Sequence, residues 1–355
     1  MSKTIIHLKG LNGIRAIAAL TVVLSHILLQ LQPSSTEITI GHALGSYGVT
    51  MFFTLSGFLI TYLLLKEKKT FGTISIKEFY IRRLLRVWPL YYFYILLVVV
   101  IMLAGSGVLP SGIWYYLFLA ANIVSLQGVA PPLLEHYWSL GVEEQFYLFW
   151  PWLVKYASPL KTISAFLLLF ILIKGALRIW MPDSIVYWFM FSSRFDCMAI
   201  GALFAILVNA GKNTFLLFCF NKISQLISWS ILLLGAAGKF QLLGFLDHDI
   251  FSVASAIIIL NVAFNNKSLL TLEHKLLNFL GRISYGIYVY HILVVYLLSL
   301  FLKDKITSMS HWLQIGLLGV LTFTLTIFIA WLSYEFFEKR FLQLKEKFSR
   351  IFSRT

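Results

Sequence analysis

Two ionisable residues lie in the first apolar segment of the chain, where a charged side chain is costly. Arg15 and His26 fall within residues 11–31 and are eleven positions apart. On a helix that spacing is about three turns, so one face presents both side chains about 16 Å apart. A buried imidazole can take up a proton or attack a carbonyl carbon, and a guanidinium binds anions. The pair predicts a polar, reactive stripe; snorkelling of Arg15 with a packing role for His26 is the alternative.

Adjacent carboxyl groups open a later apolar segment, residues 138–156. Glu143 and Glu144 point about 100° apart around a helix, so at least one is expected to face the interior and pair with His26 or Arg194. The later segments hold further polar residues that together predict a polar interior: Asp196, Ser284, Tyr285, His291, Ser333, Tyr334, Glu335 and Glu338.

An arginine cluster precedes the third apolar segment. Arg82 and Arg86 share one face of a helix and Arg83 flanks it. Guanidinium groups form paired hydrogen bonds with phosphate, which favours an anionic, phosphate-bearing ligand at the cytoplasmic mouth of the protein. Anchoring of the following segment at the membrane surface explains the same arginines equally well.

The elements that must position these residues are membrane-spanning helices. Of 355 residues, 59% are hydrophobic and only 12% are charged, whereas a soluble domain has about 25% charged residues. This composition excludes soluble globular and disordered proteins and predicts an all-α polytopic membrane protein. At about 20 residues per crossing, the sequence predicts about ten transmembrane helices, near residues 11–31, 46–65, 87–104, 138–156, 161–180, 185–208, 216–235, 248–264, 283–302 and 312–336.

The net charge of +14 is largely explained by membrane topology. Most lysines and arginines lie at the termini and in alternate loops, which predicts that both termini are cytoplasmic. Residues 1–340 are expected to form one membrane domain and residues 341–355 a basic cytoplasmic tail. No segment is typical of a nucleic-acid-binding module. Cys197 and Cys219 lie in apolar runs, so we expect neither a disulfide scaffold nor a metal site.

In their order and spacing these motifs resemble acyltransferase family 3, the bacterial integral-membrane O-acyltransferases that modify sugars. The resemblance covers nearly the whole chain. It departs from the family pattern at Lys339, which follows Glu338 where the family usually has a proline. The matching stretches are Arg15-x₁₀-His26, Phe-Phe-x-x-Ser-Gly-Phe-Leu within residues 48–59, Arg82-Arg83-x-x-Arg86-x-x-Pro89, Trp138-Ser-Leu-x-Val-Glu-Glu-Gln-Phe-Tyr147, Arg194-Phe-Asp196, Gly281-x-x-Ser-Tyr-x-x-Tyr-x-x-His291, and Ser333-Tyr-Glu335 with Glu338.

The resemblance implies a cytoplasmic acyl-CoA donor, with acetyl as the first expectation, and no bound cofactor or metal. The acceptor is expected to be a glycan, free or lipid-linked, of the cell envelope or secreted material, modified at the bacterial cytoplasmic (inner) membrane. Arg82, Arg83 and Arg86 are expected to bind the phosphates of coenzyme A. The stand-alone form, without a fused periplasmic SGNH domain, implies direct acylation or a separate periplasmic acyl-acceptor protein.

Mechanistic roles follow from the same resemblance. His26 is expected to be the general base or the transient acyl carrier, oriented by Glu143 or Glu144. Arg15 either contacts the donor or locks the first helix. From the residues alone, a transporter that exports a glycan or small anion is the competing interpretation. Supporting roles are expected for Ser56, Trp138, Arg194, Asp196, Tyr285, His291 and Glu335.

Overall fold

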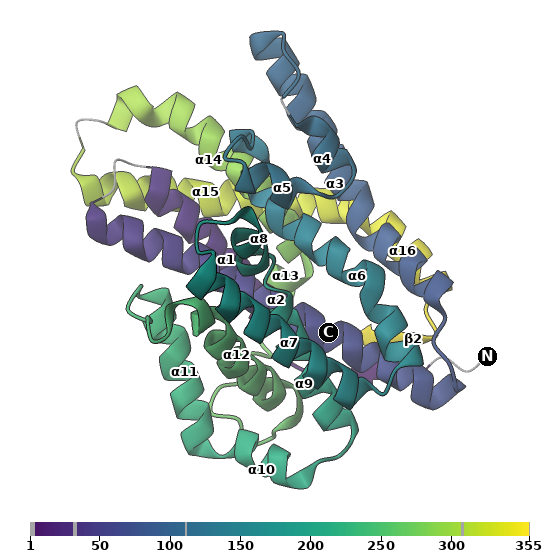
Figure 1. Cartoon of the computed structure of the whole chain (residues 1–355). Coiled ribbons are helices and arrows are strands. Elements are labelled where there is room, and N and C mark those ends of the chain that lie inside the picture. Colours follow the sequence, from purple (N-terminus) through teal and green to yellow (C-terminus); the bar gives the residue numbers. More distant parts are fainter. Residues whose placement is uncertain (1–3, 31–33, 111, 307–308, 355) are drawn as a thin grey trace.

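The computed structural model describes residues 4–30, 34–110, 112–306 and 309–354, and these residues are predominantly helical (Figure 1). Two short strands, β1 and β2, accompany the helices. The elements in chain order are β1 Thr4–His7, α1 Leu11–Gln30, α2 Ser35–Phe71, α3 Ile76–Ser106, α4 Ile113–Leu117, α5 Ala121–Leu126, η1 Pro132–Tyr137, α6 Trp138–Tyr156, α7 Pro159–Trp180, α8 Ile185–Ser193, α9 Phe195–Asn209, α10 Asn213–Phe220, α11 Lys222–Ala236, η2 Gly244–Leu246, α12 Asp247–Phe264, α13 Lys275–Arg282, α14 Ser284–Ile306, α15 His311–Ser333, η3 Tyr334–Glu338, α16 Lys339–Lys347 and β2 Ile351–Arg354.

Eight helical stretches in the described part of the chain are long and apolar enough to cross a membrane, which makes the protein a polytopic, all-α membrane protein. The ninth candidate is the pair α10 and α11, bent by 60° at their junction. Each of the ten predicted spans corresponds to helical structure, but the count of ten is not confirmed. The predicted span at residues 138–156 forms α6. This helix is not among the eight apolar stretches, because Glu143, Glu144 and Lys155 make it too polar.

The predicted span at residues 185–208 is broken at Arg194. This residue has a φ of 48°, in the left-handed region, and it separates α8 from α9. A non-glycine residue in that region adopts an uncommon conformation that its surroundings must hold. Because of this break, the Arg194 guanidinium group lies inside the bundle at the junction of two helices and not on the side of one continuous helix.

The core of the bundle is built around α2, which packs between α1 and α9 (Figure 1). Small residues set how closely α2 and α9 approach. A Cβ atom added to Gly57 would lie 1.9 Å from the Met198 carbonyl oxygen, and one added to Gly201 would lie 2.0 Å from that of Thr54. Only glycine permits this backbone contact, as is common where membrane helices cross closely.

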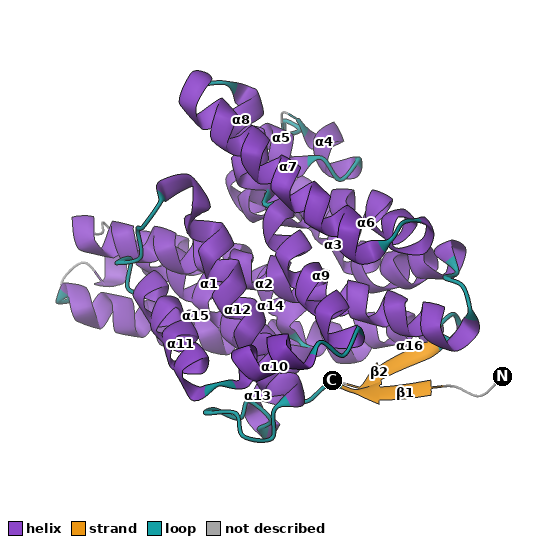
Figure 2. Ribbon diagram, turned by 60° about the horizontal axis from the view of Figure 1, so that its bottom comes forward, coloured by secondary structure: helices purple, strands orange, loops and turns teal. Residues whose placement is uncertain are grey.

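Both ends of the described chain lie on one face of the bundle. β1 and β2 pair in parallel there, with Thr4 opposite Ile351 (Figure 2). A chain whose two ends lie on the same side of a membrane crosses that membrane an even number of times. Eight or ten crossings are consistent with this arrangement, and nine are not.

The chain beyond residue 340 is not the tail that the sequence predicts. A π-helical turn at Tyr334–Glu338 joins α15 to α16, which packs against α3. Lys339 follows Glu338, and because lysine, unlike proline, has a backbone N–H, the helical structure continues. We refer to residues 339–354 as the C-terminal segment.

Candidate active site

A cavity of about 250 Å³, which we call the cationic cavity, lies between α1, α2, α3, α6, α14 and α16. Six of the predicted site residues line it: Arg15, Ser56, Arg83, Arg86, Glu143 and Tyr285. It adjoins a larger cavity of about 520 Å³, the mouth cavity, because Arg15, Arg83, Arg86 and Lys345 line both. The end of the cationic cavity away from the mouth is lined by Val49, Phe52, Phe53, Ser139 and Tyr288.

The cationic cavity has more positive than negative charge. Four basic side chains line it, together with one carboxylate, Glu143. Among the described side chains, no carboxylate oxygen lies within 4.0 Å of the basic nitrogens of Arg83, Arg86 or Lys345. Arg83 instead lies over the Tyr147 ring, 5.1 Å from its centroid. Like charges that converge in a poorly solvated site repel one another, so the cavity is suited to a polyanion.

The predicted arginine cluster divides between two environments. Arg83 and Arg86 line the cationic cavity. Arg82 lines only the mouth cavity, and its guanidinium lies 3.0 Å from a Glu67 carboxylate oxygen and donates to the Phe348 carbonyl at 3.0 Å. Arg82 is thus engaged by the protein itself. Arg15 joins Arg83 and Arg86 from α1, where it also donates to Asn12 at 3.0 Å.

Three histidines gather beyond the inner end of the cationic cavity, and we call them the three-histidine cluster: His26, His136 and His291. His291 Nε2 lies 3.3 Å from His26 Nδ1, and the two ring centroids are 4.9 Å apart. The His136 ring lies 5.1 Å from that of His291. The α1 and α14 helices pack against each other, which brings His26 and His291 together from residues 265 positions apart.

Backbone contacts assign the protons of the neutral histidines. His26 Nδ1 lies 2.9 Å from the Val22 carbonyl oxygen, which can only accept a hydrogen bond, so Nδ1 bears the proton. His291 Nδ1 likewise donates to the Tyr288 carbonyl at 2.6 Å, which leaves its Nε2 as an acceptor for His26. In this tautomer His26 Nε2 holds a free lone pair, the form that a base or a nucleophile requires.

Tyr288 separates the cluster from the cationic cavity. Its hydroxyl donates to the His136 carbonyl at 3.0 Å and lies 2.5 Å from the Ser139 hydroxyl. Because His291 follows Tyr288 by three residues on α14, the cluster lies about one helical turn beyond the lining of the cavity. His26 is not among the residues that line the described cavity.

The expected pairing of Glu143 or Glu144 with His26 or Arg194 is not observed. Glu144 accepts a hydrogen bond from the Trp88 indole at 3.2 Å. Glu143 lines the cationic cavity beside Ser56, whose hydroxyl contacts that of Tyr147. His291 takes the position beside His26 that the sequence suggested for a carboxylate, because α14 and not α6 packs against α1.

Arg194 has neutral partners. It donates to the Ser46 carbonyl at 2.8 Å and to the Thr50 hydroxyl at 3.0 Å, and it lies 5.4 Å from the centroid of the Trp138 ring. Trp138 contacts Phe53, a residue of the cationic cavity, edge to face. Arg194 and Trp138 therefore support the inner wall of that cavity.

Tyr285 lies in the interior as predicted, whereas Glu335 does not. Tyr285 lines the cationic cavity and donates to the Val87 carbonyl at 2.8 Å. Glu335, expected in the interior, instead forms a partly exposed pair with Lys339 at 2.7 Å. Glu338 is the buried carboxylate of this motif and accepts from Ser333 at 3.2 Å.

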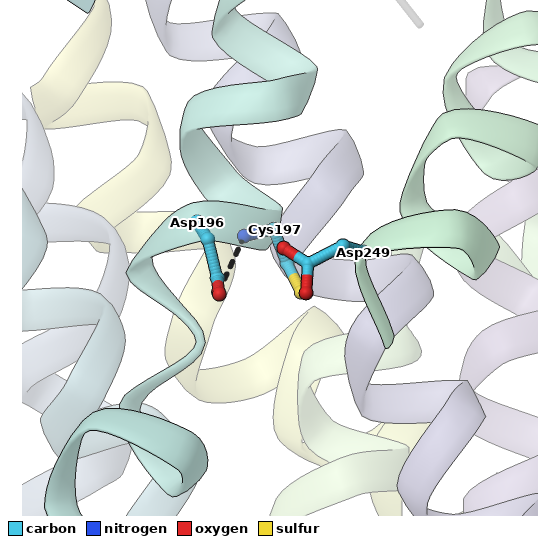
Figure 3. Close-up of side chains that lie close together, drawn as sticks. All are labelled: Asp196, Cys197 and Asp249. Atoms are coloured by element: carbon cyan, nitrogen blue, oxygen red, sulfur yellow. Dashed lines mark hydrogen bonds between the residues drawn. The ribbon is translucent and has the colours of Figure 1, made fainter. Parts of the chain in front are cut away.

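Asp196 belongs to a separate buried cluster. The Lys174 ammonium from α7 donates to Asp196 at the start of α9 and to Asp249 of α12, the latter at 2.7 Å. The possible metal-ligand atoms of Asp196, Cys197 and Asp249 lie within 4.8 Å of one another (Figure 3). Lys174 already supplies a positive charge there, so the cluster joins three helices by a buried ion pair. Cys197 and Cys219 are both free and buried.

Several residues of the site were not predicted. Tyr288 and Ser139 lie within the motifs that resemble the family, and His136 just precedes one. Their positions in the sequence could therefore have indicated that they belong to the site. Lys345 gave no such indication, because only the packing of α16 against α3 brings it to the cavity.

A third cavity, of about 670 Å³, lies towards the other end of α2, and we call it the aromatic cavity. The part of α2 that lines it also packs against α1 next to His26, since a Cβ atom on Gly45 would lie 2.6 Å from the Ser25 hydroxyl; no α1 residue is among those lining the cavity. Its rings are those of Tyr47, Tyr187, Trp188, Phe191, Phe240 and Phe245, and its polar side chains include His42, Ser46, Arg178, Gln241, Asp247 and His248.

Comparison with known proteins identifies the family. The fold and the site define a polytopic membrane protein with an internal cavity rich in basic side chains, and residues 8–331 match the family described as acyltransferase domain. The chain belongs to this family.

Its relatives include O-acetyltransferase OatA of Staphylococcus aureus strain NCTC 8325, which is 26% identical over 94% of this chain and 57% of the relative. A protein of strain COL, provisionally named an O-acetyltransferase, is 28% identical over the same shares. The chain thus spans little more than half the length of these relatives. No solved structure matches it.

Proposed function

We propose that this chain transfers an acyl group, in the first instance acetyl, from acyl-CoA to a hydroxyl group of a cell-envelope or secreted glycan. The family supports acyl transfer, and the names of the relatives support O-acetylation. The single observation that favours acyl-CoA is a cavity with four basic groups and one carboxylate that ends beside a histidine cluster. The protein would act in the bacterial cytoplasmic membrane with both termini in the cytoplasm.

The cationic cavity matches the parts of a coenzyme A thioester. Its basic end, with Arg83 and Arg86, suits the phosphate groups, because guanidinium–phosphate hydrogen bonds are charge-assisted. The apolar side chains of α2, among them Leu59 and Ile60, suit the extended pantetheine arm. A thioester at the tip of that arm would point towards Tyr288 and the three-histidine cluster.

His26 would perform the chemistry through Nε2. As a general base it takes the proton of the acceptor hydroxyl while the oxygen attacks the thioester carbonyl, and coenzyme A leaves as a thiolate that is then protonated. As an acyl carrier, Nε2 attacks the thioester carbonyl and coenzyme A leaves as a thiolate. The acceptor oxygen then attacks the acyl-imidazole, the imidazole of His26 leaves, and the proton of the acceptor hydroxyl passes to the thiolate. The hydroxyls of Ser56, Tyr147 and Ser139 line the cavity and are the donors we propose for the developing oxyanion.

The aromatic cavity supports a glycan acceptor. Its rings offer flat apolar faces for the C–H surfaces of a sugar, and its polar side chains can hydrogen-bond to hydroxyl groups. Arg178 and Asp247 balance each other in charge, which suits a neutral ligand. This cavity opens away from the face where the termini lie, so the acceptor would enter from outside the cell.

The test uses the full chain in proteoliposomes with radiolabelled acetyl-CoA and the envelope glycan of a strain lacking the gene. We expect label on the glycan with the wild type, and none above background with His26→Ala. His274→Asn, at an exposed histidine, is the control and should retain transfer. Absence of label with the wild type, or equal labelling by His26→Ala, would contradict the proposal, and glycan flux without acetyl-CoA would indicate a transporter.

A further inference from the structure

The C-terminal segment lies over the mouth cavity and is tied to the bundle there. Its residues Leu342, Ser349 and Ile351 line this cavity. Arg82 donates to the Phe348 carbonyl, and the Arg350 Nε atom lies 2.7 Å from a Glu78 carboxylate oxygen. Pairing of β2 with β1 adds backbone hydrogen bonds at the same face (Figure 2). The segment is thus a fixed part of the wall.

One side chain of this segment reaches both the cationic cavity and the mouth cavity. Lys345 lines the two cavities together with Arg15, Arg83 and Arg86. The neighbouring lysines of α16 do not line either cavity. Lys339 pairs with Glu335 and Lys347 is exposed. The position of Lys345 therefore reflects the packing of α16 and not merely the basic composition of the segment.

We propose that Lys345 is a phosphate-binding residue of the donor site. This inference rests on the proposed function, in which the donor is acyl-CoA. An ammonium group placed among three guanidinium groups is unfavourable unless an anion joins them, and no described carboxylate lies within 4.0 Å of Lys345. A ligand with several phosphate groups removes that repulsion. Lysine adds a compact point charge to the forked donors of the arginines.

The consequence is that the donor site is completed by the last helix of the described chain. Arg83 and Arg86 of α3 and Arg15 of α1 would contact the phosphates from within the bundle. Lys345 of α16 would contact them from the segment that forms the wall of the mouth.

The experiment measures the Kd of coenzyme A for the full chain in lipid nanodiscs. The variants are Lys345→Ala, Lys345→Arg and the control Lys347→Ala on the same helix. We expect Lys345→Ala to raise the Kd about tenfold, as for loss of a hydrogen bond to a charged group. Lys345→Arg and Lys347→Ala should bind within about threefold of the wild type. The defect of Lys345→Ala should shrink at high ionic strength, because salt screens charge interactions.

The outcomes separate this inference from the proposed function. Binding by the wild type with an unchanged Kd in Lys345→Ala overturns the role of Lys345 alone. Equal weakening by Lys345→Ala and Lys347→Ala overturns it as well, since it would reflect general surface charge. Failure of the wild type to bind coenzyme A would overturn both the proposed donor and the role of Lys345.

Discussion

His291 and His26 face each other across the α1–α14 contact, with His291 Nε2 3.3 Å from His26 Nδ1. Because His26 Nδ1 also donates to the Val22 carbonyl, both contacts hold the ring with Nε2 unprotonated. His291 therefore orients the His26 ring, a role that a carboxylate more often has. This makes His291 a positioning residue in the proposed mechanism.

Removal of His291 should lower kcat without a large change in the KM for acyl-CoA. We expect His291→Ala to lose about 10- to 100-fold in kcat, because His26 loses one of the two groups that orient it. His291→Gln should recover part of the rate, since its amide oxygen can accept from His26 Nδ1. Steady-state kinetics on proteoliposomes would check this, and equal kcat values for the Ala and Gln variants would count against a positioning role.

Arg86 and Arg82 are expected to have different roles, the first in binding acyl-CoA and the second in holding the C-terminal segment. Arg86→Ala should raise the KM for acyl-CoA about tenfold, because Arg86 lines the cationic cavity without a carboxylate within 4.0 Å among the described side chains. Arg82→Ala should have a smaller effect on KM and should loosen the C-terminal segment instead, because Arg82 contacts Glu67 and Phe348. Kinetics and limited proteolysis of the C-terminus measure the two effects, and a reversed order would contradict this division.

The buried Lys174 should be important for stability and not for catalysis. Lys174→Met leaves the Asp196 and Asp249 carboxylates facing each other without a cation, and unpaired buried charges cost about 3–5 kcal/mol. Thermal unfolding in detergent should show a clearly lowered Tm. The triple variant with Asp196→Asn and Asp249→Asn should regain part of it, and a Tm no higher than that of Lys174→Met would argue against ion pairing as the cause.

A methyl group at the α2–α9 crossing should prevent normal packing. Gly57→Ala places its Cβ 1.9 Å from the Met198 carbonyl oxygen, so the two helices must separate. We expect a strong loss of folded, monodisperse protein by size-exclusion chromatography. Gly105→Ala on α3 is the matched control, because no atom lies within 4 Å of its added Cβ. Normal yield of Gly57→Ala would refute the close crossing.

The aromatic cavity should affect the acceptor and not the donor. Trp188→Ala removes one of its rings and should raise the KM for the glycan several-fold while coenzyme A binding stays unchanged. Trp180→Ala removes an exposed tryptophan that does not line the described cavity and serves as the control. The same KM for the glycan in both variants would exclude this cavity as the acceptor site.

The amino-acid sequence alone determined the class of the protein and most of the polar residues of its interior. Hydropathy is a local property, so apolar runs of about 20 residues predict membrane helices wherever they occur. For the same reason Arg15 and His26 stand out within an apolar run, and the Arg82–Arg86 stretch stands out immediately before one.

Only the tertiary structure decided which of these residues meet. The sequence suggested a carboxylate beside His26, whereas the structure places His291 there, and it brings Lys345 from a predicted tail into the cationic cavity. It also pairs Lys174 with Asp249, 75 residues apart. The rotation and crossing of each helix depend on contacts with its neighbours, which helical periodicity does not specify. Residues far apart in the sequence therefore acquire partners only when the bundle packs.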